Sequence, residues 1–558
     1  MARAAAAAAA FSGRTAAFAA ALAAALALAA CTAPSSNQGP SASAPRLVVF
    51  MAVDGLPQRQ VLAYRDQLAP DGFARFLNQG TWYSNAHYGH AYTVTAAGHA
   101  TMLTGAYPHR TGVIGNEWRE RDSGDTVYCT GDPAYVYLDS PTKKLDGTSP
   151  ANLRAETVGD VLLRADPRAK VVSISGKDRG AILPGGRSGT AYMYMSSTGR
   201  FASSTYYMKE QPAWARAFNA ARPADGYFKK AWQPLLPDAA YARSLPDDQP
   251  WYAKGGKLPM VMGEAQDKPD GAYYAALLRS PFVDQMSLDF ARAAIAGEGL
   301  GQDGVPDILS ISLSGHDYVN HAFSAESRLS HDHFLQLDRM LAAFFKDLDR
   351  TVGAGNYVAV LTADHGFMPA PEYSAAQGKP AGRANAGEML GRVNAGLKAR
   401  FGQEKLAKFF SASALMLDRQ LIAAHGLNFD AVADEARRLL LADPAVAVAY
   451  TRRELKDDSR KGAPYFEAMR NSWYEERSGD VQFALKPYWL ASSSPTGTTH
   501  GSPYEYDTHV PILTWGPSWV QRGEVSASVQ VVDIAPTLAK WLGVPMPAQA
   551  EGRVLPMP

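Results

Sequence analysis

Six aspartate and histidine residues that could bind metal ions are spread along this 558-residue chain. They are Asp54, Asp317, His321, Asp364, His365 and His500. Asp317 and His321 are four residues apart, so on a helical turn their side chains would share one face and could hold one ion. Taken singly, an aspartate is usually a turn residue and a lone histidine is usually structural. As a set, carboxylates and imidazoles suit zinc, and two ions about 4 Å apart can clamp both sides of an in-line displacement.

The elements that must position these side chains are short apolar runs, each followed by polar or glycine-containing residues. The runs are 47–53, 171–175, 308–313 and 357–361. Such runs are typical of buried parallel strands. Helical patterns lie between them, at about 58–79, 157–165, 285–296 and 329–352. The alternation predicts an α/β fold: a doubly wound, largely parallel sheet with helices on both faces. Ligands bind beyond the carboxyl ends of the strands in that architecture, where most of the candidate residues lie.

Two stretches depart from the alternation. Residues of about 190–280 are rich in tyrosine, tryptophan, proline and glycine, and residues of about 372–490 have helical patterns of their own, such as Asp430 to Leu441. We predict that both are insertions that form a cap beside the active face. Their aromatic residues could contact a substrate or pack the core of the insertion itself.

The overall charge excludes binding that depends on bulk electrostatics. Lys and Arg number 55 against 54 Asp and Glu, a net charge of +1. Nucleic acid as a specific partner is therefore not expected, and affinity for a phosphate group must be local. The only cysteines, Cys31 and Cys129, cannot form a thiolate zinc site with the usual ligand number, so metal ligands must be His, Asp and hydroxyl groups.

The first 45 residues resemble an export signal and a tether. Arg3 and Arg14 precede an uncharged apolar run, 15–30, that ends in Leu-Ala-Ala-Cys. This pattern predicts a signal peptide over 1–30, with a lipid on Cys31 if the ending is a bacterial lipobox, or ordinary cleavage nearby. Residues 31–45, rich in Ser, Pro and Ala, suit a flexible tether. We expect a catalytic domain over 46–558, exported to the periplasm or outer membrane and lipid-anchored.

Four motifs occur in the order found in the alkaline phosphatase superfamily. They are Val53-Asp54-Gly55, Thr95-Ala-Ala-Gly98-His99, Thr362-Ala-Asp364-His365-Gly366 and His500-Gly501-Ser502-Pro503. From Leu47 to the carboxyl end, the chain resembles the bacterial threonine-nucleophile alkaline phosphatases, which are relatives of the nucleotide pyrophosphatases/phosphodiesterases. The resemblance implies an enzyme with two Zn²⁺ ions that acts on small-molecule phosphate esters, and we expect it to be a monomer.

The resemblance also implies how the ligands divide. Asp317, His321 and His500 would hold one zinc ion, and the second would be held by Asp54, Thr95, Asp364 and His365. Two rival ligands remain, because His316 neighbours Asp317 and His509 follows His500 by nine residues. His99 is expected to support the site from behind or to be structural.

Thr95 is the candidate nucleophile. It begins a predicted helix, whose free amide groups and partial positive charge favour phosphate. Threonine is a poor nucleophile unless it is activated, and zinc coordination can supply that activation. The alternative is that Thr95 only caps the helix. Thr93 and Thr101 are the competing hydroxyl groups.

Lys177 and Arg179 follow a predicted strand and would point the same way if their segment is extended. Two cations there could neutralise phosphate oxygens, and the family has a matching Gly-Lys-Asp-Arg sequence. Asn116 falls where the family places an amide that donates to a phosphate oxygen. A non-catalytic interpretation also remains. Lys177 and Arg179 could be ordinary surface charges, and Asn116 could simply form a turn.

Zinc-dependent hydrolysis of phosphate monoesters through a phosphothreonine intermediate is therefore the predicted function. A dianionic monoester matches two cations better than a diester does, so phosphodiesterase or nucleotide pyrophosphatase activity is the alternative. A sulfatase should carry a Cys/Ser-x-Pro-x-Arg sequence, which the Thr95 segment lacks. The non-enzymatic alternative is a surface lipoprotein that binds phosphorylated or glycan ligands.

Overall fold

The computed structural model describes residues 43–558. The predicted signal peptide, Cys31 and most of the predicted tether lie outside the described residues. Among the helices that are described, none has the length and apolarity that crossing a bilayer requires.

A nine-stranded sheet forms the centre of the fold, in the order β20-β2-β19-β12-β1-β11-β6-β7-β8. The five central strands are parallel: β12 (Tyr357–Thr362), β1 (Leu47–Val53), β11 (Asp307–Leu313), β6 (Val171–Ser175) and β7 (Thr190–Met195). The outer strands are β20 (Gly523–Val525), β2 (Thr81–Tyr83), β19 (Ile512–Trp515) and β8 (Arg200–Ala202). β19 and β8 run antiparallel to their central neighbours. The predicted α/β fold with a largely parallel sheet is confirmed.

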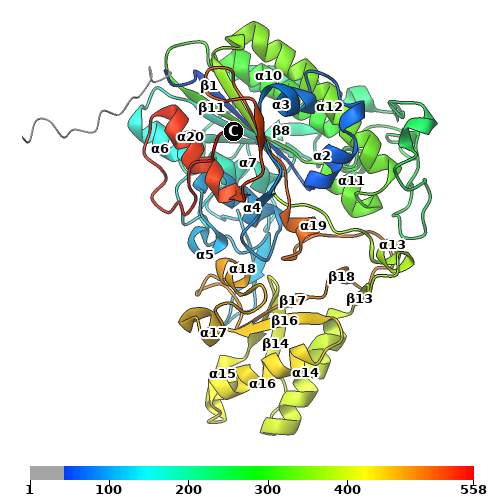
Figure 1. Ribbon diagram of the computed structural model, residues 1–558, viewed down its shortest axis with the longest axis vertical. Helices are drawn as coiled ribbons and strands as arrows, with labels where there is room; N and C mark the ends of the chain where they lie inside the picture. Colours follow the sequence, from blue (N-terminus) through cyan, green and yellow to red (C-terminus); the bar gives the residue numbers. More distant parts are fainter. Residues whose placement is uncertain (1–42) are drawn as a thin grey trace, which may run out of the picture. The chain divides into compact units, whose positions relative to one another are not determined.

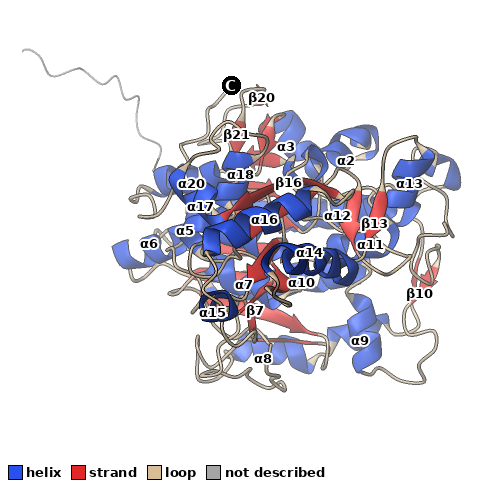
Figure 2. Ribbon diagram, turned by 90° about the horizontal axis from the view of Figure 1, so that it is seen from below, coloured by secondary structure: helices blue, strands red, loops and turns tan. Residues whose placement is uncertain are grey.

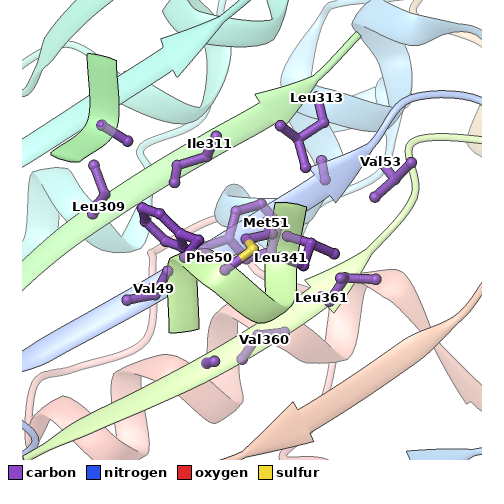
Figure 3. Close-up of a cluster of buried hydrophobic side chains, with 14 of the residues drawn as sticks. Val49, Phe50, Met51, Val53, Leu309, Ile311, Leu313, Leu341, Val360 and Leu361 are labelled. Atoms are coloured by element: carbon purple, nitrogen blue, oxygen red, sulfur yellow. The ribbon is translucent and has the colours of Figure 1, made fainter. Parts of the chain in front are cut away.

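Strand β1 is apolar along its whole length because both of its faces are covered. All seven of its residues are buried. Figure 3 shows Phe50 and Met51 of β1 beside Ile311 of β11 and Leu361 of β12, with Leu341 of a covering helix among them. Burying side chains on both faces requires a helical layer on each side of the sheet, which is why the strand does not alternate between apolar and polar residues.

Helices from far apart in the sequence supply the two layers (Figure 1). One layer contains α3 (Phe73–Gln79), α10 (Pro281–Glu298) and α12 (Arg328–Leu348). The other contains α4 (Thr95–Thr104), α6 (Val158–Ala165), α7 (Asp178–Gly185) and α20 (Ile534–Leu542). The helical pattern at about 58–79 is divided between two helices. The segment forms α2 (Gln58–Ala63), a 3-10 turn and α3, because Pro70 and Gly72 interrupt it and Asp338 accepts hydrogen bonds from the Ala69 and Phe73 amides there.

Part of the first expected insertion belongs to the main sheet. Residues 190–202 form β7 and β8, so the boundary at about 190 is wrong. The aromatic residues that suggested a cap pack the edge of the sheet instead: Tyr192 lies 5.4 Å from the Trp214 ring and 5.3 Å from the Phe290 ring. The following residues, up to 280, form short elements that include α8 (Ala213–Ala220), β9 (Ala231–Trp232), β10 (Met260–Val261) and α9 (Gly271–Leu277).

The second stretch, about 372–490, contains a sheet and a core of its own. The sheet has the order β14 (Ala407–Ser411), β15 (Ala414–Leu417), β17 (Val481–Leu485) and β16 (Val446–Thr451). Its helices are α14 (Ala386–Phe401), α15 (Arg419–Ala424), α16 (Phe429–Leu441), α17 (Arg452–Asp457) and α18 (Phe466–Asn471). Figure 2 shows α14 and α16 lying over this sheet. A two-stranded ladder of β13 (Gly382–Ala384) and β18 (Trp489–Ala491) lies at its two chain ends.

Candidate active site

The candidate metal ligands lie beyond the carboxyl ends of adjacent strands. Asp54 directly follows β1, and Asp364 and His365 follow β12. Asp317 lies in the first turn of α11 (Gly315–Phe323), which begins just after β11, and His321 lies one turn further along that helix. His500 arrives from the loop before α19 (Glu505–Thr508). The sheet thus brings together side chains separated by up to 446 residues of sequence.

Two groups of side chains have ligand atoms close enough together to hold an ion. In Asp54, Asp364 and His365 these atoms lie within 4.8 Å of one another, and the same holds for Asp317, His365 and His500. His321 adjoins the second group, because its Nε2 lies 3.4 Å from Asp317 Oδ1. The Nε2 of His365 lies 3.5 Å from Asp54 Oδ1 and 4.0 Å from Asp317 Oδ1, so it stands between the two groups.

Backbone carbonyl groups fix the orientation of all three histidines. The Nδ1 atoms of His321, His365 and His500 lie 2.9, 2.8 and 2.8 Å from the carbonyl oxygens of Thr498, Gly366 and Thr93, respectively. A carbonyl oxygen can only accept, so each Nδ1 must donate. Each Nε2 then keeps a lone pair that faces the carboxylates, which is the arrangement that metal-binding histidines adopt.

The carboxylates carry more negative charge than the surrounding protein balances. Asp54, Asp317 and Asp364 are all at most 2% exposed. Lys177 is the one lysine or arginine of the described chain that forms an ion pair with them, with its Nζ 2.7 Å from Asp54 Oδ2 and 2.5 Å from Asp317 Oδ2. Asp54 Oδ1 and Asp317 Oδ1 are buried without a hydrogen-bond partner. Buried charges require compensation, so these oxygens fit divalent cations.

The pKa shifts follow from burial and from this charge cluster. Burial, with the Asp317 and Asp364 carboxylates adding to it, raises the pKa of Asp54 well above its usual value. Burial also opposes ionisation of Asp317, but His321, Lys177 and His500 hold its pKa well below the usual range. Burial lowers the pKa values of His365 and His500. Both imidazoles are therefore neutral near pH 7, as ligation requires.

Thr95 begins α4 and points toward the same cluster. Its Oγ1 lies 3.5 Å from His365 Nε2, and the residue is 1% exposed. Gly98, one turn along, brings the helix against the β12 loop: a Cβ there would lie 2.1 Å from the Asp364 carbonyl oxygen. A side chain at this position would push the hydroxyl away from the carboxylates. The two competing hydroxyl groups have hydrogen-bond acceptors outside the cluster. The Thr93 hydroxyl donates to the Ser502 carbonyl, and the Thr101 hydroxyl donates to the Ala97 carbonyl.

The residues predicted to bind phosphate surround the start of α4. Asn116 Oδ1 accepts a hydrogen bond of 2.9 Å from the Ala96 amide. Arg179 Nη1 lies 3.0 Å from the Tyr128 hydroxyl, which in turn donates to Asp178 at 2.6 Å. The segment is not extended, because Lys177 is the N-cap of α7 and Arg179 lies in its first turn. Both residues nevertheless lie close to the carboxyl end of β6, because α7 begins directly after that strand.

The structure separates the rival histidines from the cluster. His316 lies 2.8 Å from Gln60 Oε1 and 3.2 Å from the ring of His333. His509 Nε2 donates to the Ser84 carbonyl. His99 supports the cluster from behind: its Nδ1 donates to the Thr95 carbonyl at 2.9 Å and lies 3.2 Å from Asp364 Oδ2.

Comparison with known proteins places the chain in a family. The model of the type I phosphodiesterase / nucleotide pyrophosphatase family matches residues 48–509. The chain belongs to this family. It is part of the alkaline phosphatase superfamily, so the predicted membership is confirmed.

Similar members of the superfamily span nearly the whole chain. Alkaline phosphatase PafA of Elizabethkingia meningoseptica is 34% identical over 514 residues, which cover 91% of this chain and 93% of PafA. Alkaline phosphatase PhoV of Synechococcus elongatus is 33% identical, and the match covers 92% of this chain and 93% of PhoV. A Myroides odoratus protein named calcium-transporting ATPase is 34% identical, and the match covers 90% of this chain and 92% of that protein. The crystal structure of wild-type PafA superposes with a TM-score of 0.85 over 93% of this chain and 99% of PafA. The prediction that the chain is an enzyme of the alkaline phosphatase type is confirmed.

Sequence reasoning missed two tyrosines of the candidate site. Tyr128 orients Arg179, and the Tyr318 ring lies 5.0 Å from the Lys177 ammonium group. Tyr318 could have been noticed because it follows Asp317 directly. Tyr128 lies in the short strand β5 (Thr126–Tyr128). No sequence pattern indicates that it contacts Arg179.

Proposed function

We propose that this chain hydrolyses phosphate monoesters, with Thr95 as the nucleophile and two zinc ions as cofactors. One observation carries the proposal. Three histidines whose Nδ1 atoms are occupied by carbonyl groups present Nε2 to three buried carboxylates, beside the Thr95 hydroxyl. The relatives named alkaline phosphatases support the monoester assignment.

The donor set fits two ions. Asp54, Asp364, His365 and the Thr95 oxygen would hold one, and Asp317, His321 and His500 would hold the other. His365 also reaches the second group, and the imidazole and carboxylate donors suit zinc. When bound, the ions would lower the pKa of the Thr95 hydroxyl and offset negative charge on the attacking and leaving oxygens.

The chain's own groups then account for two displacement steps. In the first, a bond forms between Thr95 Oγ1 and phosphorus while the bond from phosphorus to the ester oxygen breaks. The alcohol leaves with the proton that Thr95 gave up. In the second, water attacks the phosphothreonine, the bond from phosphorus to Oγ1 breaks, one proton of the water passes to Oγ1, and inorganic phosphate leaves. The buried start of α4 holds Thr95 in one place for both steps.

Three further side chains would hold the transferred group. The Asn116 oxygen is occupied by the Ala96 amide, so its amide nitrogen remains to donate to a phosphate oxygen. Arg179 is oriented by Tyr128, and Lys177 adds a second cation. These groups can offset the charge that non-bridging oxygens carry through phosphoryl transfer.

Substitution of Thr95 tests the proposal. The Thr95→Ala variant should fold and bind zinc but lose turnover of an aryl phosphate, while Thr95→Ser should keep part of it. The assay follows chelation and stepwise return of zinc, with the metal content measured at each step. Near-normal turnover by Thr95→Ala, or turnover independent of metal, would refute the proposal.

We also propose export of a monomeric enzyme with a lipid on Cys31, on the sequence pattern alone. Cell fractionation of the full chain and of its Cys31→Ala variant tests this. A membrane-associated wild type and a released variant are expected, and the same soluble distribution for both would contradict lipidation.

A further inference from the structure

A cavity of about 350 Å³ lies between the second sheet and the candidate active site. Its walls include Tyr92, Met389, Phe410, Phe483 and Trp489. The rings of Phe410 and Phe483 lie 5.2 Å apart and are tilted by 59°. The walls contain no lysine or arginine. We call this cavity the alcohol pocket.

The alcohol pocket adjoins the active site on two sides. On one side, His500 is itself part of the wall. On the other, the wall residues Tyr92 and Ala412 approach the residue before Asn116: a Cβ at Gly115 would lie 3.2 Å from the Tyr92 ring and 3.5 Å from Ala412 Cβ. The cavity therefore lies between the turn that carries the proposed phosphate-binding amide and a proposed zinc ligand.

The tip of the second sheet is strained where it closes this pocket. Ala412 and Ser413 connect β14 and β15 with φ angles of 45° and 60°. Residues other than glycine, asparagine and aspartate rarely occupy this region, and two in succession cost stability. The preceding residue is tied to the main domain, because Ser411 Oγ accepts a hydrogen bond of 2.9 Å from the Arg119 amide. This hydrogen bond ties the hairpin to the main domain despite the strain in its turn.

A buried carboxyl group holds the part of the wall next to His500 in place. Asp507 is 1% exposed, and its Oδ2 accepts hydrogen bonds from the Gly501 and Ser502 amides at 3.1 and 2.9 Å. Its Oδ1 is buried and has no partner. Asp507 therefore fixes the Gly501–Ser502 segment, which follows His500 in the wall of the pocket.

We infer that the alcohol pocket receives the organic group of the monoester and favours a flat, uncharged aromatic group over a small alkyl or a polyphosphate group. The inference rests on the proposed function. In-line attack by Thr95 places the leaving oxygen on the opposite side of phosphorus, toward the ion that Asp317, His321 and His500 would hold. The organic group then leaves on the His500 side, where the aromatic walls can stack on a ring. With no cation in the walls, a second phosphate would be uncompensated.

Two inhibitors test the inference without depending on which chemical step limits turnover. Benzylphosphonate and methylphosphonate are compared by their inhibition constants on the zinc-loaded enzyme. In Phe410→Leu, which keeps apolar contact but removes a ring, benzylphosphonate should bind about fivefold to tenfold more weakly, as loss of an aromatic contact predicts. Methylphosphonate should be unaffected, because it does not reach the pocket.

A second variant fills the pocket from an exposed position. Ala491→Trp should weaken benzylphosphonate at least tenfold and leave methylphosphonate unchanged. Ala442→Trp is the matched control, because this exposed alanine lies in the same insertion but outside the pocket. Equal effects on both inhibitors, or unchanged benzylphosphonate binding in both pocket variants, would overturn the inference. Thr95-dependent hydrolysis of methyl phosphate, measured in parallel, would show whether the proposed function survives that result.

Discussion

Replacing Lys177 by methionine should destabilise the metal-free protein far more than the zinc-loaded protein. The Lys177 ammonium group contacts Asp54 and Asp317, and none of the three side chains is more than 3% exposed. Removing one partner from a buried ion pair costs about 3–5 kcal/mol. Without metal, we expect Lys177→Met to lose about 3 kcal/mol of folding stability, at the lower end of this range. The loss is limited because Asp54 has a raised pKa and can take up a proton. With zinc bound, the ions balance the carboxylates, and we expect a loss below about 1 kcal/mol.

Urea unfolding of Lys177→Met, with chelator and with excess zinc, measures this difference. Lys456→Met is the matched control, because Lys456 pairs with Glu475 at 2.9 Å on the surface, where the side chains are 62% and 43% exposed. Its effect should be about 0–1 kcal/mol in both conditions. If Lys177→Met lost the same stability with and without zinc, the carboxylates would not be the ligands, and the reasoning would be refuted.

The other predictions concern charge, pH and metal content. Arg179→Ala should lower kcat/KM for an aryl phosphate monoester about a hundredfold but for a diester less than about fivefold; equal losses would contradict the proposed discrimination. Burial lowers the pKa of His90 to about 3, so the unfolded chain takes up a proton as the pH falls below about 6.5 and folding stability is lost. The free energy of unfolding of wild type, measured with urea, should therefore fall by about 2 kcal/mol more between pH 8 and pH 5 than that of His90→Phe. Identical pH profiles of stability in the two proteins would contradict the assignment of this loss to His90. Metal analysis should find less zinc in His500→Ala but not in His509→Ala, and the reverse order would favour the rival ligand.

The positions of the metal-binding candidates could be predicted because they depend on strand ends. Apolar runs without alternation identified four central strands, and the carboxyl ends of parallel strands meet at one edge of a sheet. Asp54, Asp317, Asp364 and His365 follow such strands and meet there. His500 follows no central strand, and only the motif order of the family identified it.

The remaining features depend on contacts that sequence patterns do not encode. The aromatic residues of β7 resembled a cap because a strand near the edge of a sheet and the core of an insertion have similar composition. The choice between His500 and His509 depends on which carbonyl oxygen each ring meets, and that is a property of tertiary packing. The alcohol pocket brings together residues 92, 410 and 489. These residues lie in different segments of the chain, and no sequence periodicity connects them. Strain at Ala412 is likewise visible only in the backbone angles.

The central claim is that Thr95 itself is phosphorylated during turnover, and direct detection of the intermediate tests it. The zinc-loaded enzyme is mixed with an aryl phosphate, quenched in acid within the first turnovers, digested and examined by mass spectrometry. We predict one phosphate on the peptide that contains Thr95, located at that residue, and none in Thr95→Ala. Active wild-type enzyme that carries the phosphate on Thr93 or Thr101 instead would contradict the account.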